Sequence, residues 1–173
     1  YCLQTNLTFR MNLMLSEVGL NGEKKKSVHT NKNRESKTLF GALSLSTQTF
    51  YWKQAERGNS KIFIQFLHQL HKAKPNKKIV MIIDNGSIHR SKIVAKFVKK
   101  HEWIELFYLP PYSPEYNPIE LFWKWLKRKI YGASGFSCIE QLIGCIRKFI
   151  WHYNENRLID SIKFEFNAYR ELL

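Results

Sequence analysis

The sequence predicts a single α/β domain, residues 1–173, built around a five-stranded mixed sheet with flanking helices. Two observations lead to this fold class. Apolar patterns along the chain follow the order three strands, helix, strand, helix, strand and then helices. No helix separates the early strands, whereas helices separate the later ones, so we expect an antiparallel meander followed by parallel strands. The hydrophobic share of 44% argues against a disordered chain.

The first three strands are expected at about 1–9, 38–46 and 49–54. Residues in the first of them alternate between apolar and polar, which is typical of a half-buried strand. The short link between the second and third strands predicts an antiparallel hairpin. The polar segment 10–36 is rich in lysine and arginine, and we expect a long basic loop or hairpin arm there.

A helix is predicted over 60–73, because apolar residues recur there with the helical period and Ser60 is a suitable N-cap. The uninterrupted apolar run at 79–83 predicts a central strand that is buried on both faces. The last strand is expected at 103–109, where the segment WIELFYL is ended by two prolines.

The remaining helices are expected at about 90–100, 118–131 and 137–156. Cys138 and Cys145 are seven residues apart on the last of these, hence on one face, where we expect core packing rather than a metal pair. The inner stripe of the helix over 90–100 is expected to consist of Ile93, Val94, Phe97 and Val98.

The chain carries a net charge of +14, from 28 basic and 14 acidic residues. An excess of this size indicates a polyanionic partner, of which nucleic acid is the most common. No apolar run approaches the ~20 residues that cross a bilayer, and no signal peptide is visible. We therefore expect a cytoplasmic protein with no membrane partner.

Asp84 follows directly on the apolar run at 79–83, at the carboxyl end of a predicted strand. Functional groups of open α/β sheets gather at this edge, so Asp84 is a candidate ligand or catalytic group. The alternative is an Asp-Asn-Gly turn, in which the carboxylate accepts only local backbone N–H groups. The local pattern favours the turn and leaves both interpretations open.

Glu120 lies in the first turn of the helix predicted over 118–131, which begins with Asn117 as N-cap and a proline at the first helical position. It stands at the edge of the apolar stripe, where it can point toward solvent or toward the end of the sheet. The alternative role is the return arm of a capping box. The expected buried stripe consists of Ile119, Phe122, Trp123, Leu126 and Ile130.

Two segments together carry a resemblance to a known family: IIDNGSIHRSK at 82–92 and IELFYLPPYSPEYNPIELFWKWLK at 104–127. They combine an Asp-Asn-x-x-x-His element with Leu-Pro-Pro-Tyr-Ser-Pro-x-x-Asn-Pro-Ile-Glu. Thirty-five residues, 85–119, separate the two carboxylates. The chain resembles the catalytic core of mariner-like bacterial insertion-sequence transposases of the DDE superfamily. This resemblance implies a ribonuclease H-like fold and metal-dependent cleavage and transfer of DNA strands.

By the same resemblance, an intact site uses two Mg²⁺ or Mn²⁺ ions to activate the attacking oxygen and stabilise the leaving one. Asp84 would bind both ions and Glu120 one of them. His89 would contact a phosphate, orient Asp84, or be a structural residue at a helix start. Asn85 and Asn117 are expected in supporting roles, as a turn residue and a helix cap.

The family requires a third acidic residue, on the opening strand, and this chain lacks it. The matching stretch is Gln4-Thr5-Asn6, so Thr5 occupies the place of the first catalytic aspartate. We therefore expect a transposase catalytic domain with impaired catalysis, or alternatively an inactive DNA-binding remnant of a mobile element. Three other acidic residues are weaker substitutes for the missing ligand: Glu17, Glu23 and Asp160.

The expected partner is DNA, both the transposon ends and the target, and the bound protein would associate with the nucleoid. A helix-turn-helix region that reads transposon ends is not recognisable, so we expect that region to be absent. By family analogy, a homodimer on paired DNA ends is a further expectation. A nuclease of RNA–DNA hybrids is a third candidate, which the proline-rich element before Glu120 argues against. The candidate DNA-binding residues are Lys24, Lys25, Lys26, Lys32, Arg34 and Lys37, then Lys124, Lys127, Arg128 and Lys129.

Overall fold

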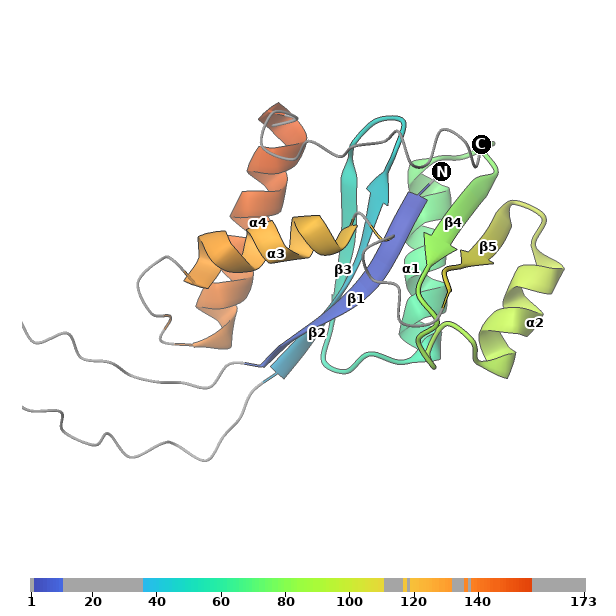
Figure 1. The fold of residues 1–173 in the computed structure, drawn as a ribbon, viewed down its shortest axis with the longest axis horizontal. Helices are drawn as coiled ribbons and strands as arrows, with labels where there is room; N and C mark the ends of the chain where they lie inside the picture. The colour runs from blue at the N-terminus through green and yellow to red at the C-terminus, as the bar shows by residue number, and fades with distance from the viewer. Residues whose placement is uncertain are drawn as a thin grey trace, which may run out of the picture.

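The computed structural model describes residues 2–10, 36–110, 117, 119–131, 136 and 138–156, which form five strands and four helices (Figure 1). The strands are β1 (Cys2–Arg10), β2 (Ser36–Ser44), β3 (Phe50–Ala55), β4 (Ile79–Ile83) and β5 (Ile104–Tyr108). The helices are α1 (Ser60–Ala73), α2 (Lys92–Lys100), α3 (Ile119–Tyr131) and α4 (Ile139–Asn156).

The strands form one sheet in the order β3-β2-β1-β4-β5. β1 pairs antiparallel with β2, and β2 with β3, whereas the β1–β4 and β4–β5 pairs are parallel. The predicted antiparallel meander followed by parallel strands is therefore confirmed. Because β1 is the middle strand, it lies directly beside both the hairpin and the strand that carries Asp84 at its end.

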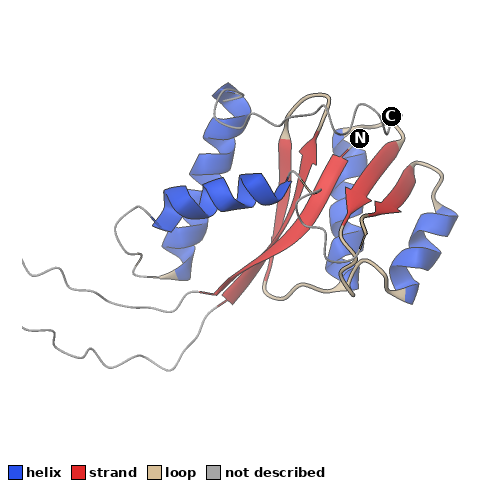
Figure 2. Ribbon diagram, viewed as in Figure 1, coloured by secondary structure: helices blue, strands red, loops and turns tan. Residues whose placement is uncertain are grey.

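Helices cover both faces of the sheet (Figure 2). α1 and α2 pack on one face, in a cluster that includes Phe40, Phe63 and Val94. α3 and α4 pack on the other face, where Phe122 and Trp123 contact the residues of β2 and β3. None of the helices within the described ranges has the length and apolar character that a membrane crossing needs.

β4 is an interior strand, paired on both sides, but its burial differs between its two faces. Ile79, Met81 and Ile83 are buried against the α1–α2 layer, whereas Val80 and Ile82 are half-buried. The α3–α4 layer packs mainly on β2 and β3 and reaches β4 at Ile82. The sequence predicted burial of this strand on both faces, and the structure buries it fully only on the face that α1 and α2 cover.

The N-cap of α1 is Asn59, and not Ser60 as the sequence predicts. The Asn59 side chain accepts the Ile62 N–H at 3.0 Å, which satisfies one of the free donors of the first turn. Ser60 is the first helical residue, and its hydroxyl donates to the Ile88 carbonyl at 3.0 Å. Both residue types are common caps, so the local sequence could not distinguish them.

The inner stripe of α2 is narrower than predicted. Val94 is buried and Phe97 and Val98 are half-buried, whereas Ile93 is 52% exposed. Successive helical residues are rotated by about 100°. Val94, Phe97 and Val98 therefore fall within one arc, and Ile93 falls outside it. A short helix that contacts the sheet along one line buries only that arc.

The expectation that both cysteines pack in the core is wrong. α4 begins at Ile139, so Cys138 precedes the helix, and it is only half-buried. Cys145 lies on the helix and is exposed. Larger apolar side chains take the inner face of α4 instead, and these are Ile139, Leu142, Ile143, Ile146, Ile150 and Tyr153.

Two side-chain amides cover part of the outer edge of β3. Asn154 of α4 accepts the Phe50 N–H at 2.8 Å and donates to the Phe50 carbonyl at 2.9 Å. Gln69 of α1 donates to the Trp52 carbonyl at 3.0 Å. These amides occupy backbone groups that could otherwise pair with a strand of another molecule. The edge strand is therefore tied to a helix of each layer.

Gly41 in β2 determines how closely α3 approaches the sheet. A Cβ atom at this position would lie 2.4 Å from Cζ2 of Trp123 and 2.6 Å from Cζ of Phe50. The Trp123 side chain is 1% exposed and meets the Phe50 ring edge-on. The missing side chain at Gly41 thus makes the space that the Trp123 indole fills.

The substitution Gly41→Ala should lower the free energy of unfolding by about 1–3 kcal/mol, because the added methyl group overpacks this contact. Gly144→Ala is the matched control. A Cβ there meets no atom within 4 Å, so alanine in mid-helix should stabilise the protein by up to about 1 kcal/mol. Urea denaturation of both variants and the parent tests this pair. Equal stability of the parent and Gly41→Ala would show that Trp123 does not occupy this space.

Candidate active site

Asp84 is the first residue after β4, at the carboxyl end of the parallel part of the sheet. The pairing with β5 continues up to this point, because the Leu109 N–H donates to the Ile83 carbonyl at 2.8 Å. The Asp84 side chain is 48% exposed, so solvent reaches its carboxylate. The strand thus delivers an accessible carboxylate at a well-anchored position.

Asp84 also begins a turn, as its Asp-Asn-Gly context predicts. The Gly86 N–H donates to Oδ1 of Asp84 at 2.9 Å. The His89 and Arg90 N–H groups then donate to the Gly86 carbonyl at 3.0 and 3.2 Å. The turn engages one carboxylate oxygen, so the turn and the ligand interpretations of Asp84 are compatible with each other.

His89 lies under this turn and is 1% exposed. Its Nε2 is 3.5 Å from Oδ1 of Asp84, and its ring stands edge-on to Phe63 with centroids 4.5 Å apart. Burial lowers the pKa of His89 below its usual value, although the nearby Asp84 carboxylate acts in the opposite direction. A ring this deeply buried favours contact with Asp84 over contact with a substrate phosphate.

Three side-chain hydrogen bonds anchor the loop after Asp84. The Ser60 hydroxyl of α1 donates to the Ile88 carbonyl, and the Tyr108 hydroxyl of β5 donates to the His89 carbonyl, each at 3.0 Å. The Asn85 amide donates to the Leu109 carbonyl. Burial raises the pKa of Tyr108, and the positive charge of Arg90 lowers it to a smaller extent. The sequence analysis predicted a supporting role for Asn85 but missed Ser60 and Tyr108 here, because nothing local marks these contacts.

The backbone register places Thr5 beside Asp84. In the parallel pair of β1 and β4, Gln4 is the partner of Ile83, so the residues that follow this last pair are Thr5 and Asp84. In the antiparallel pair with β2, Thr5 is the partner of Gly41. This is the position at which the resemblance expects the first catalytic aspartate.

Glu120 lies in the first turn of α3 and is half-buried. Its N–H donates to the carbonyl of Asn117 at 2.9 Å, and Asn117 is 2% exposed, so the start of the helix is held inside the protein. One turn further on, Trp123 fills the space at Gly41, the residue opposite Thr5. α3 also contacts β1 and crosses that face of the sheet (Figure 1). The packing thus places the first turns of α3 near Gly41 and its partner Thr5.

The outer face of α3 is basic. Lys124, Lys127, Arg128 and Lys129 are all exposed, and Glu120 is the only acidic residue of this helix. Lys37 lies on β2, where it forms an ion pair with Glu56. The other basic candidates at 24–34, and the acidic candidates Glu17, Glu23 and Asp160, lie outside the described residues.

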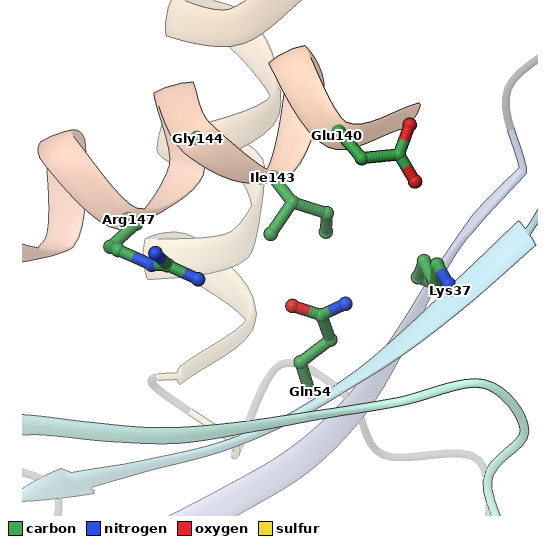
Figure 3. A pocket seen from close by; sticks show the side chains of 6 residues that line it. All are labelled: Lys37, Gln54, Glu140, Ile143, Gly144 and Arg147. Carbon is green, nitrogen blue, oxygen red and sulfur yellow. The ribbon is translucent and has the colours of Figure 1, made fainter. Parts of the chain in front are cut away.

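A cavity of about 270 Å³ opens between α4 and the strands β2 and β3 (Figure 3). It combines two cationic side chains with one carboxylate and does not include Asp84 or Glu120. It is therefore separate from the candidate active site. Its lining residues are Lys37, Gln54, Glu140, Ile143, Gly144 and Arg147.

The donor atoms at the candidate site suit a hard divalent cation in type. Asp84 and Glu120 supply carboxylate oxygens, which Mg²⁺ prefers over nitrogen or sulfur ligands. Within the described residues, no group of three or more histidine, cysteine, aspartate or glutamate side chains is placed to hold a metal ion.

The lowered pKa of His89 predicts a pH dependence of stability. Below pH of about 6.5 the unfolded chain takes up a proton at His89 more readily than the folded protein, so the free energy of unfolding should decrease as the pH falls. Above that pH the contribution of His89 to the free energy of unfolding should be constant. The slope from one such group is at most about 1.4 kcal/mol per pH unit.

Urea denaturation between pH 5 and 8 tests this, by comparing the parent with His89→Gln. The variant should show a flatter dependence, whereas His152→Gln, at an exposed position, should keep the parent's slope. If the free energy of unfolding of His89→Gln depended on pH as steeply as that of the parent, His89 would not be the source of the pH dependence.

Comparison with known proteins finds a matching endonuclease family and a similar protein from an insertion element. The family model described as "DDE superfamily endonuclease" matches residues 16–143. The 39 kDa protein of insertion element IS630 from Shigella sonnei is 30% identical over 132 residues, which are 76% of this chain and 38% of that protein. The chain therefore spans well under half the length of the curated relative that it matches.

Solved structures of retroviral proteins share the fold. One is a chain of the simian T-cell lymphotropic virus intasome, solved in complex with PP2A regulatory subunit B56 gamma. It matches with a TM-score of 0.58 at 14% identity, and the match covers 84% of this chain and 46% of the intasome chain. The HTLV-2 integrase catalytic core domain, solved with magnesium in a trimeric form, has a TM-score of 0.52 at 10% identity, with coverage of 87% and 81%. Integrase catalytic cores are ribonuclease H-like, so the predicted fold class is confirmed.

Proposed function

The chain belongs to the DDE superfamily of endonucleases, and from this membership we propose that it is the catalytic domain of a DNA transposase whose strand cleavage and transfer are impaired. One observation carries the proposal. The register of β1 and the packing of α3 on Gly41 support the proposal that Thr5, Asp84 and Glu120, the three positions that the resemblance assigns to metal ligands, form one site. The mariner-like subtype remains a prediction from the sequence.

The proposed substrate is DNA, at transposon ends and at a target site. The charge of +14 and the basic outer face of α3 support this proposal. Contacts of lysine and arginine with phosphates supply affinity and register and carry little sequence information. A homodimer that holds two DNA ends is part of the proposal by family analogy.

The residues of this chain would prepare a phosphodiester for attack. Divalent ions, Mg²⁺ or Mn²⁺, supply the chemistry when bound, by activating the attacking oxygen and stabilising the leaving one. Asp84 and Glu120 would hold them, Asp84 from its anchored turn and Glu120 from the first turn of α3. Lys124 and Lys127, one and two turns beyond Glu120, would contact the phosphates of the bound strand.

Thr5 is the reason for the proposed impairment. A threonine hydroxyl carries no charge, so the site has one negative charge fewer than three carboxylates provide. This weakens the attraction for divalent ions and removes the ligand expected between Asp84 and α3. The alternative function, a DNA-binding remnant without catalysis, rests on the same observation.

Restoring the missing carboxylate tests the proposal directly. Thr5→Asp should raise the Mn²⁺ affinity of the full chain by more than about tenfold, the lower end of effects known for changes around metal ligands. It should also give metal-dependent nicking of supercoiled plasmid. The double variant Thr5→Asp with Glu120→Gln should lose the nicking while keeping its fold. If Thr5→Asp gains neither metal binding nor nicking, position 5 is not the first ligand.

The contribution of α3 to DNA binding is tested by a charge-matched pair of variants. Lys124→Gln with Lys127→Gln should weaken duplex binding and reduce the slope of log affinity against log salt by about 2, because two phosphate contacts are lost. Lys99→Gln with Lys100→Gln removes the same charge from α2, on the other face of the sheet, and should change the slope little. Equal effects of the two pairs would argue for binding through net charge alone.

A further inference from the structure

Two nitrogen atoms approach the same oxygen of Asp84. The Gly86 N–H donates to Oδ1 at 2.9 Å, and Nε2 of His89 lies 3.5 Å from that oxygen. The side chain is nevertheless 48% exposed. Both contacts involve Oδ1, and neither involves the other oxygen, Oδ2.

The position of the imidazole is fixed by its surroundings. The ring of His89 is 1% exposed and lies edge-on to Phe63 of α1. Its carbonyl accepts the Tyr108 hydroxyl, and its N–H donates to the Gly86 carbonyl. A side chain held by α1, β5 and its own turn can restrict the rotation of the carboxylate that it touches.

Gly86 leaves the space in which this contact forms. A Cβ atom at Gly86 would lie 3.0 Å from Oδ1 of Asp84 and 3.1 Å from Cδ2 of His89. Any side chain there would press between the carboxylate and the ring. The glycine of the Asp-Asn-Gly turn thus serves the contact between Asp84 and His89 as well as the turn.

We propose that His89 is a positioning residue, which donates its Nε2 proton to Oδ1 of Asp84 together with the Gly86 N–H, so that Asp84 offers only Oδ2 to a divalent cation. This inference deepens the proposed function and rests on it for the identity of the ligand. The distance of 3.5 Å is at the long limit of a hydrogen bond, and contacts of this kind tighten when the ligand arrives. A carboxylate with one oxygen engaged binds a cation through the other in a defined direction.

The first measurement concerns the proton of the ring and needs no metal. At pH 7.5, above the ordinary pKa of histidine, a neutral imidazole carries one proton, on Nε2 or on Nδ1. Long-range ¹H–¹⁵N correlation spectra of the full chain should show His89 as the Nε2–H tautomer. Asp84→Asn should shift the Nε2 signal, whereas Glu105→Gln, at a residue of β5 paired with Lys78, should leave it unchanged. The Nδ1–H tautomer would overturn the proposal.

The second measurement uses Mn²⁺ affinity in the chain that carries Thr5→Asp. His89→Leu removes the donor. In His89→Asn the shorter side chain places its amide nitrogen near the position of Nδ1, so it does not reach the position of Nε2. Both should weaken Mn²⁺ binding by about 10–100-fold, as loss of a group that orients a metal ligand does. His89→Gln reaches the place of Nε2 with an amide N–H and should keep an affinity close to that of the Thr5→Asp chain. Thermal unfolding of each variant establishes that it is folded.

The outcomes separate this inference from the proposed function. Equal Mn²⁺ affinity in His89→Leu and His89→Gln, both folded, would overturn the positioning role. If the Thr5→Asp chain binds no Mn²⁺, position 5 is not the first ligand of the proposed site, and the tautomer alone then decides whether His89 donates to Asp84. An Nε2–H tautomer, together with Mn²⁺ affinity that is lost in His89→Leu and kept in His89→Gln, supports both the positioning role of His89 and the proposed function.

Discussion

The contact between Trp123 and Gly41 is the constraint on which the arrangement of the site depends. The indole occupies the space where any other residue of β2 would carry a side chain, so α3 lies against the sheet at one position along the strand. Because Gly41 is opposite Thr5, and Thr5 is beside Asp84, this contact also relates the first turn of α3 to both strands. The location of Glu120 therefore follows from packing one helical turn away, in the buried core.

The turn after β4 combines two roles that are usually considered as alternatives. Asp84 accepts a local backbone N–H, as in any Asp-Asn-Gly turn, and this fixes one of its oxygens. The anchors from Ser60, Tyr108 and Asn85 then hold the whole loop against α1 and β5. A rigid turn of this kind can present the second oxygen with little loss of conformational freedom. Because the turn engages one oxygen of the Asp84 carboxylate, the other oxygen is left for a ligand.

Most of the fold could be predicted from local patterns. The order of strands and helices, the antiparallel and parallel pairings and the buried stripe of α3 followed from hydrophobic period and link length. The errors lie where tertiary contacts choose between locally equivalent options. Asn59 and Ser60 are both good caps, and a contact with Ile88 engages Ser60. Ile93 and Cys145 are apolar but lie outside the arcs that the sheet covers.

The sequence by itself determined the residue types of the candidate site: a carboxylate at a strand end, a glutamate at a helix start and a basic helix after it. These are properties of composition and spacing, which need no coordinates. Only the tertiary structure decided that Thr5 lies beside Asp84, that Gly41 receives Trp123, and that His89 is buried against Oδ1. Such relations join residues far apart in the chain, and they depend on strand register and side-chain volume, which no local pattern encodes.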